Sequence, residues 1–226
     1  MPTAPTETLR AHRYHHGDLR RTMVRAAVRL IEAKGPSGFT LREVAQIVGV
    51  THPAVYRHFP SRATLVAEVA EQGFRSLTRH IDRSVGTPRS PLARLQEVGV
   101  AYVRFAVAHP GHFRVMFGDD AREAGGETLQ QARDEAFGRV VAEIAACQAR
   151  GLLRTGPPQA LGLSAWVMVH GLAMLLLDRS PRLLRLGLRA DELARQVTEA
   201  LMEGLMPSRV ERASAVHARR DRESRR

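Results

Sequence analysis

Residues 40–59, TLREVAQIVGVTHPAVYRHF, constrain the fold more than any other part of the sequence. Thr40 and Glu43 have the spacing of a capping box, in which each side chain binds the other residue's backbone N–H at the start of a helix. Gly49 is expected to end that helix, because glycine adopts the left-handed backbone that a sharp turn needs. The pattern of capped helix, glycine turn and short helix predicts a helix-turn-helix.

The short helix after the turn is expected to start at Thr51 as its N-cap, with Pro53 in the first turn, where a missing N–H costs nothing. Val55 and Phe59 are expected to face inward. A helix supported in this way presents its first residues to the major groove of DNA. We therefore expect four residues to lie at base edges: Thr51, His52, Pro53 and Ala54.

Positive charge gathers at the two ends of the chain. Residues 1–62 carry 10 basic and 4 acidic side chains, and residues 207–226 carry 7 and 3, whereas residues 63–206 are nearly balanced at 17 and 16. A basic end on a neutral body favours a nucleic-acid partner, although a solvated surface in an arginine-rich chain gives the same balance. The residues expected to contact phosphates are Tyr56, Arg57, His58 and Arg62.

The rest of the chain shows helical periodicity and no strand alternation, so we expect an all-α fold. Breaks and polar stretches predict a disordered basic arm at 1–13, a DNA-binding domain at 14–76, a second helical domain at 86–206, and a disordered arginine-rich tail at 207–226. Helices are expected at 62–85, 92–108, 111–117, 127–150, 159–178 and 191–206.

The quoted stretch, together with its flanks GFTLREVAQIVGVTHPAVYRHFPSRATLVAEV and AAVRLIEAKG, resembles the DNA-binding domain of TetR-family transcriptional regulators. The segments HPGHFRVMFG and WVMVHG resemble a C-terminal domain type named for its Trp, His and Gly. The resemblance implies an all-helical homodimer, in which the domain at 86–206 of each subunit is a regulatory and dimerisation domain with a ligand pocket. It also implies that Tyr56 and His58 bind phosphate with help from Thr40, Arg42 and Arg62. Pro53 departs from the family, which often has a small residue there.

The residues also favour a homodimer independently. One short recognition helix contacts few bases, whereas two heads about 34 Å apart read a palindrome. The segments 160–177 and 190–206 have apolar faces suited to a four-helix interface between subunits, although burial within one subunit accounts for part of each face.

Methionines and aromatics at helical spacing occur both in ligand pockets and in ordinary hydrophobic cores. The residues assigned to the pocket are Phe105, Phe113, Met116, Phe117, Phe137, Trp166, Met168, His170 and Met174. They predict a small, largely apolar effector whose identity the sequence does not give.

No metal or other cofactor is expected. His109 and His112 fit a structural turn better than a metal-sensing pair, and Cys147 has no partner in sequence for a redox role. A single cysteine and an N-terminus without an apolar run favour the cytoplasm. The uncharged stretch 161–177 is expected to be a buried core helix and not a membrane span.

The chain is not expected to be an enzyme, because it lacks a nucleophile elbow, a phosphate-binding glycine loop and a metal-ligand motif. We expect a sequence-specific transcriptional regulator, a repressor released from a palindromic operator by its ligand. The alternative is a non-sequence-specific or architectural DNA-binding protein without ligand control.

Overall fold

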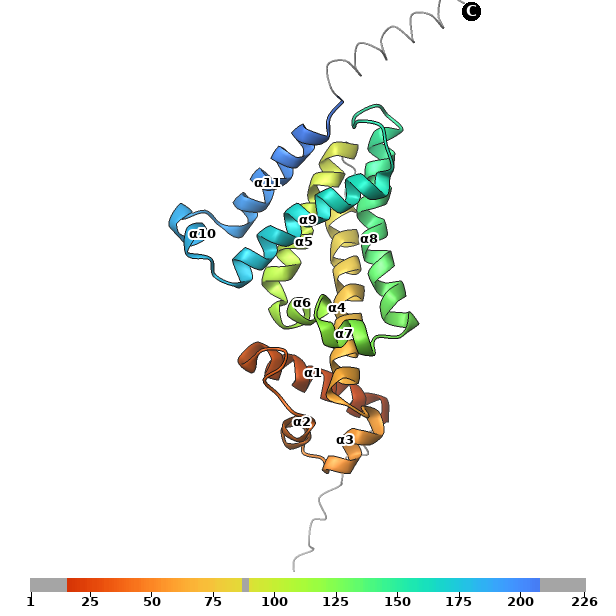
Figure 1. Cartoon of the computed structure of the whole chain (residues 1–226), viewed down its shortest axis with the longest axis vertical. Coiled ribbons are helices and arrows are strands. Elements are labelled where there is room, and N and C mark those ends of the chain that lie inside the picture. Colours follow the sequence, from red (N-terminus) through yellow and green to blue (C-terminus); the bar gives the residue numbers. More distant parts are fainter. Residues whose placement is uncertain (1–15, 87–89, 208–226) are drawn as a thin grey trace, which may run out of the picture.

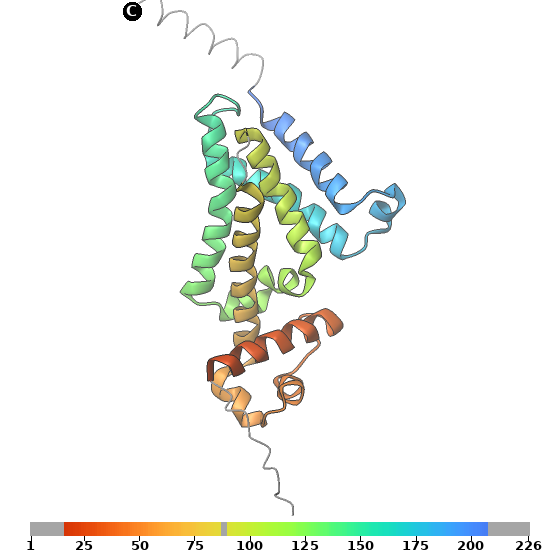
Figure 2. The same ribbon diagram turned by 180° about the vertical axis from the view of Figure 1, so that it is seen from behind.

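The computed structural model describes residues 16–86 and 90–207, and within these ranges the chain forms eleven helices and no strand. The expected all-α fold is therefore confirmed. The predicted arm at residues 1–13, and the predicted tail except for Pro207, lie outside the described residues. A small three-helix head lies at one end of the molecule and a larger helical body at the other (Figures 1 and 2).

The head consists of α1 (His16–Lys34), α2 (Leu41–Val48) and α3 (His52–His58). The capping box of Thr40 and Glu43 is present at the start of α2. Gly49 ends the helix with φ +74°, and its N–H donates to the Ala45 carbonyl at 2.9 Å. The predicted helix-turn-helix is thus present with the capping and turn residues that the sequence indicated.

The start of α3 differs in one detail from the prediction. Thr51 occupies the N-cap position, but its side chain makes no capping hydrogen bond. Pro53, one of the two residues whose N–H a cap would bind, has no N–H to donate. The N–H of Ala54 donates instead to the Thr51 carbonyl oxygen at 3.0 Å.

The helix α4 (Arg62–Val85) joins the head to the body. It begins as expected after Ser61, whose hydroxyl accepts from the Thr64 N–H at 3.1 Å. It continues past residue 76 without a break and packs against α1 in the head and against four helices of the body. Both parts therefore share one rigid element (Figure 1).

The body is a bundle around the C-terminal half of α4, with two short helices between the bundle and the head (Figure 2). The bundle helices are α5 (Pro91–Ala108), α8 (Glu127–Gln148), α9 (Pro158–Leu177) and α11 (Ala190–Leu205). The short helices are α6 (Pro110–Met116) and α7 (Asp119–Ala124).

Two helices are absent from the sequence prediction. They are α7 and α10 (Pro181–Leu186), and each has six residues, too few to show a helical repeat. Gly118 is the N-cap of α7, and Asp119 and Asp120 are its first two residues.

The prediction that residues 161–177 form a buried core helix was wrong in part. One side of α9 is buried against α5, α8 and α11, but Leu163 and Val167 are 52% and 57% exposed on the other side. Among the described residues, α9 alone is long and apolar enough to cross a membrane, a test that core helices of soluble proteins also pass. Its exposed side instead belongs to an apolar surface of the body.

Candidate DNA-binding face and ligand cavity

The recognition helix α3 has one buried and one exposed side. Val55 and Phe59 are fully buried, as predicted, whereas Tyr56 on the other side is 46% exposed. His52 and Tyr56 lie one turn apart with their ring centroids 4.8 Å apart, edge to face. Exposed positions on this helix and at its cap form the candidate DNA-binding face: Thr51, His52, Pro53, Tyr56 and Arg57.

Ala54 does not belong to that face. It was expected at a base edge, but it is only 8% exposed. Neighbouring residues on a helix are about 100° apart, so Ala54 and Val55 share the side of α3 that packs against α2. With so little exposed surface, Ala54 is left out of the candidate DNA-binding face. His58 is half-buried at the C-terminal end of the same helix.

Thr40 and Arg42 lie at the start of α2. The Thr40 hydroxyl donates to the Glu43 carboxylate at 2.9 Å and accepts from its N–H. An ion pair with Lys34 and the hydrogen bonds from Thr40 hold the pKa of Glu43 below its usual value. Arg42 is exposed, so its side chain is accessible to a DNA backbone.

Arg62, expected at a phosphate, binds elsewhere in this structure. Its guanidinium donates to the Pro36 carbonyl at 2.7 Å and pairs with Asp120 of α7 at 2.8 Å. It also lies over the Phe39 ring, 5.8 Å from the centroid. The pair joins the head to the body, because Arg62 is the first residue of α4.

Arg20 has a role that sequence reasoning missed. It pairs with Glu68 of α4, donates to the His58 carbonyl at 3.0 Å, and lies 4.5 Å from the centroid of the Phe59 ring. These contacts fix the end of the recognition helix. They connect residues 38 and 48 positions apart, so no local pattern could indicate them.

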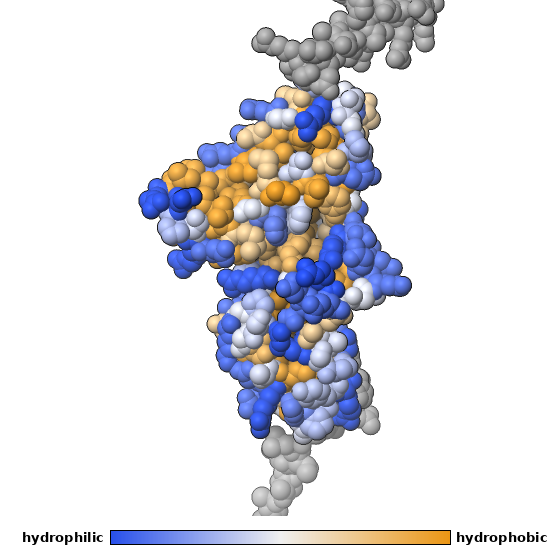
Figure 3. Space-filling model, in the orientation of Figure 1, coloured by the Kyte–Doolittle hydropathy of each residue, from blue (hydrophilic) through white to orange (hydrophobic). Residues whose placement is uncertain are grey.

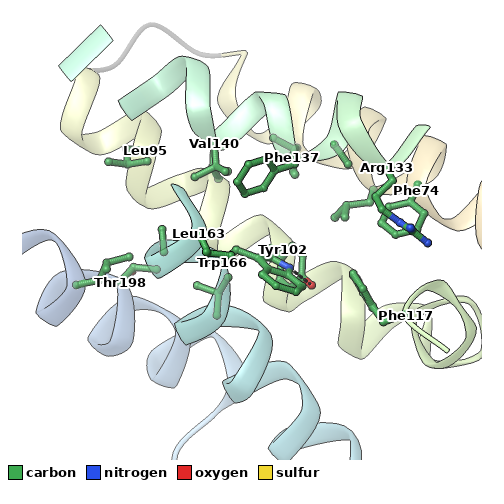
Figure 4. Close-up of a pocket in the computed structure, with 18 of the residues that line it drawn as sticks. Phe74, Leu95, Tyr102, Phe117, Arg133, Phe137, Val140, Leu163, Trp166 and Thr198 are labelled. Carbon is green, nitrogen blue, oxygen red and sulfur yellow. Dashed lines mark hydrogen bonds between the residues drawn. The ribbon is translucent and has the colours of Figure 1, made fainter. Parts of the chain in front are cut away.

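A cavity of about 490 Å³ lies in the body and opens partly to solvent, since its wall includes Leu163, which is 52% exposed; its volume is within the size range of small-molecule sites. Apolar side chains of α4, α5, α8, α9 and α11 form most of its wall (Figure 4). Three of the nine pocket residues assigned from the sequence line it, namely Phe117, Phe137 and Trp166. The single tryptophan of the chain is therefore a natural fluorescent reporter of the cavity.

The other six assigned residues are not part of the cavity wall. Phe105, Phe113 and Met116 are buried core residues, whereas Met168 and Met174 are exposed on the outer side of α9. His170 lies behind the wall and stacks on Trp166 with centroids 5.0 Å apart. Sequence reasoning also missed lining residues of two helices: Phe74, Leu77, Ile81 and Tyr102.

A hydrogen-bonded trio forms one side of the cavity. Trp166 Nε1 donates to the Tyr102 hydroxyl at 3.2 Å, and that hydroxyl lies 2.8 Å from His170 Nδ1. Burial raises the pKa of Tyr102 and lowers the pKa of His170. Both bonds form when Tyr102 accepts from Trp166 and donates to a neutral His170.

The other candidate sensing residues show no assembled site. Within the described ranges, no group of three or more His, Cys, Asp or Glu side chains could hold a metal ion. The rings of His109 and His112 are 6.2 Å apart, and burial lowers the pKa of His112. Cys147 is fully buried, and burial raises the pKa of its thiol, which makes the thiol a poor nucleophile.

Comparison with known proteins covers both parts of the chain. A family model described as "Bacterial regulatory proteins, tetR family" matches residues 23–69, and one described as "Tetracyclin repressor-like, C-terminal domain" matches residues 95–218. The nucleoid occlusion factor SlmA of Vibrio vulnificus strain YJ016 is 30% identical over 138 residues, which are 61% of this chain and 70% of the relative.

Solved structures have the same architecture. A protein of unknown function from Rhodococcus sp. RHA1 is 30% identical with a TM-score of 0.75, over 87% of this chain and 100% of that one. The TetR family transcriptional regulator PfmR from Thermus thermophilus is 19% identical with a TM-score of 0.65, over 82% and 99% of the two chains.

Proposed function

Because the chain belongs to the TetR family of DNA-binding transcriptional regulators, we propose that it is a repressor released from a palindromic operator by a small, largely apolar ligand. The observation that carries this proposal is the apolar cavity, whose wall includes the helix that begins next to the recognition helix. In this proposal His52 and Pro53 contact bases, while Tyr56, Arg57 and Arg42 contact phosphates.

The geometry supplies a route from the cavity to the head. Phe74, Leu77 and Ile81 of α4 line the cavity, and the same helix begins directly after the recognition helix. A ligand that displaces these side chains would shift α4 and with it the head. Because interiors are close-packed, such a shift is transmitted along the helix instead of being absorbed locally.

The Arg62–Asp120 pair provides a second connection. Phe117, Gly118 and Arg122 line the cavity on either side of Asp120. Movement of α7 by a ligand would therefore pull on the carboxylate that holds Arg62. We propose that a ligand breaks this pair and that the loss of the pair contributes to the loss of operator affinity.

We also propose a homodimer through the outer face of α9. Apolar side chains gather over α9 and extend to the α10 segment (Figure 3). A patch of this kind on a folded chain marks an interaction surface. The exposed apolar residues of these two segments are Leu163, Val167, Met168, Met174, Leu175, Leu184, Leu186 and Leu188.

Two narrower assignments belong to the same proposal. We assign the C-terminal domain to the type named for Trp, His and Gly, because Trp166 and His170 of the WVMVHG segment form the trio with Tyr102. We place the protein in the cytoplasm, where its DNA partner would be.

A second candidate function is DNA binding without ligand control. The SlmA relative favours it, since that protein's name assigns it to nucleoid occlusion. The cavity favours the ligand-controlled regulator, because an architectural protein has no need of an apolar cavity against the helix that carries its DNA-binding head.

The test is fluorescence anisotropy on duplex DNA from the protein's own upstream region and on scrambled duplex, across a salt series. A repressor should bind its own region at least ~1,000-fold more tightly, in the range typical of specific DNA recognition, with two subunits per site. Equal binding to both duplexes that collapses with salt would contradict the proposal and support the architectural candidate.

A further inference from the structure

Few charged side chains line the cavity, and most of these are already paired. Within residues 16–86 and 90–207, those in its wall are Arg122, Arg133 and Asp134. Arg122 forms an ion pair with Asp119 at 2.6 Å, and Asp134 accepts a hydrogen bond from the Gln130 amide at 2.8 Å. Arg133 is the exception.

Arg133 has no ion pair within the described part of the chain. Its guanidinium lies over the ring of the buried Phe74, 5.5 Å from the centroid. Its hydrogen bond to the Gln130 side-chain oxygen is long, at 3.4 Å. A guanidinium has five N–H donors in a fork that matches a carboxylate, so most of its binding capacity is unused.

The remaining polar groups of the wall are engaged. The Thr198 hydroxyl donates to the Ala194 and Arg195 carbonyls, and the Gln96 amide donates to Glu199 at 3.3 Å. The Tyr102 hydroxyl takes part in the trio with Trp166 and His170. Arg133 is therefore the strongest donor in the wall that is left for a polar group of a ligand.

The position of Arg133 defines the orientation of a ligand. Arg133 and Phe74 lie at one end of the cavity and Leu95 at the other, with Trp166 and Tyr102 between them (Figure 4). A molecule bound along this axis would place one end at the guanidinium and the rest against apolar side chains.

We infer that the effector is an apolar molecule carrying a single anionic group, such as a carboxylate, which binds Arg133. This inference rests on the proposed ligand-controlled function and gives its ligand a chemical class. A wholly apolar ligand would strip water from an unpaired guanidinium, at a cost that no contact offsets. A carboxylate replaces that water with a charge-assisted, two-point hydrogen bond.

A cationic ligand does not fit the same site. Among the described residues, Asp134 is the single acidic residue of the wall, and it is exposed. Arg133 and Arg122 would both repel a positive group in the cavity.

The experiment compares decanoate with decan-1-ol, two probes of equal chain length that differ in the charged group. Binding is followed by Trp166 emission, at probe concentrations below those at which either compound aggregates. Decanoate should bind the wild-type protein at least tenfold more tightly than decan-1-ol. In Arg133→Gln this advantage should vanish while the affinity for decan-1-ol stays within about threefold, which shows that the cavity is intact.

Arg139→Gln is the matched control. Arg139 lies on the same helix α8, pairs with Asp82 on the surface at 2.8 Å, and is not part of the cavity wall. This variant should keep the full preference for decanoate. Arg133→Lys should keep part of it, because a lysine retains the charge without the planar fork.

The outcomes separate this inference from the proposed function. Equal affinity of decanoate and decan-1-ol for the wild-type protein would overturn the anionic-ligand inference and leave the cavity as a site for apolar ligands. A decanoate preference that survives in Arg133→Gln would overturn the role of Arg133. If a panel of apolar acids, alcohols and esters produces no change in Trp166 emission or in melting temperature, the ligand-binding function itself fails.

Discussion

The head and the body of this protein are both helical, yet they differ in the side chains that they expose. The head packs a small core behind a polar face, on which Tyr56 and Arg57 are exposed beside buried Val55 and Phe59. The body keeps an apolar cavity inside and an apolar face outside. The head thus presents polar and charged side chains at its surface, whereas the body leaves apolar surface in its cavity and on its outer face, which we propose to bind a ligand and a second subunit.

Phe59→Ala should unfold the head and leave the body folded. Phe59 is fully buried between α3 and α4, and truncation of a buried phenylalanine costs about 3–5 kcal/mol. Operator binding should be lost, with a matching fall in the free energy of unfolding measured by circular dichroism. Trp166 emission should still report a folded body that responds to ligand.

The reciprocal control is Phe117→Ala at the cavity, which should alter ligand binding and leave operator affinity unchanged. If Phe59→Ala unfolds the tryptophan environment to the same extent as the head, the two regions form one cooperative unit.

His52→Ala tests whether His52 contacts a base. His52 is exposed in the first turn of α3, and loss of a base contact costs about 1–3 kcal/mol of discrimination at one base pair. Anisotropy against a set of single-base operator variants should show relaxed preference at one position in each half-site. Tyr56→Phe is the comparison variant, and it should weaken binding to all duplexes alike by about 1 kcal/mol. An unchanged preference in His52→Ala would remove His52 from the base-reading set.

Acid should weaken the body through two half-buried histidines. Burial lowers the pKa values of His112 and His170 below the usual 6.5, so the unfolded chain binds more protons than the folded one below that pH. Stability should therefore fall as the pH drops from about 6.5, at less than about 1.4 kcal/mol per pH unit for each ring, because both are partly open to water. Urea unfolding from pH 7 to pH 5 measures this.

His170→Asn tests the assignment, since asparagine can accept from Tyr102 and cannot titrate in this range. A shallower pH dependence is expected in this variant. An identical slope would mean that His170 does not contribute.

Asp120→Asn should weaken the connection between the two regions, with the smallest effect of the four. The Arg62–Asp120 pair is about a quarter exposed on each side, so its contribution is a few tenths of a kcal/mol to about 1 kcal/mol. Operator affinity with and without ligand should differ less than in the wild-type protein.

Glu123→Gln is the control on the same helix, because it removes one negative charge from α7 at an exposed side chain that is not part of the cavity wall. It should leave the coupling unchanged. Equal coupling in Asp120→Asn and in the wild-type protein would show that α4 alone transmits the signal.

The sequence predicted most helix boundaries to within two or three residues, because capping residues and glycines act over three or four positions. Thr40, Gly49 and Ser61 each mark an end that the structure reproduces. The exposed side of α3 was predicted less completely. An alanine fits either side of a helix, and Ala54 lies on the buried side. The short helices α7 and α10 were missed because six residues hold too little periodicity.

Which residues line the cavity could not be predicted from the sequence. Phe117 and Met116 are neighbours with similar chemistry, yet the first lines the cavity and the second is fully buried in the core. Arg133 has no feature that separates it from the other arginines in the sequence. Its partner Phe74 lies 59 residues away on another helix.

The sequence by itself determined the helix-turn-helix, the all-helical fold and the basic character of the DNA-binding end, because capping, turn geometry and net charge depend on residue type and short spacing. The tertiary structure decided which aromatics surround a cavity, that Arg62 joins the head to Asp120, and that Arg133 lies at an apolar cavity with no acidic partner among the residues that the structure describes. These features depend on the packing of helices distant in the chain, which brings together side chains that no local pattern relates.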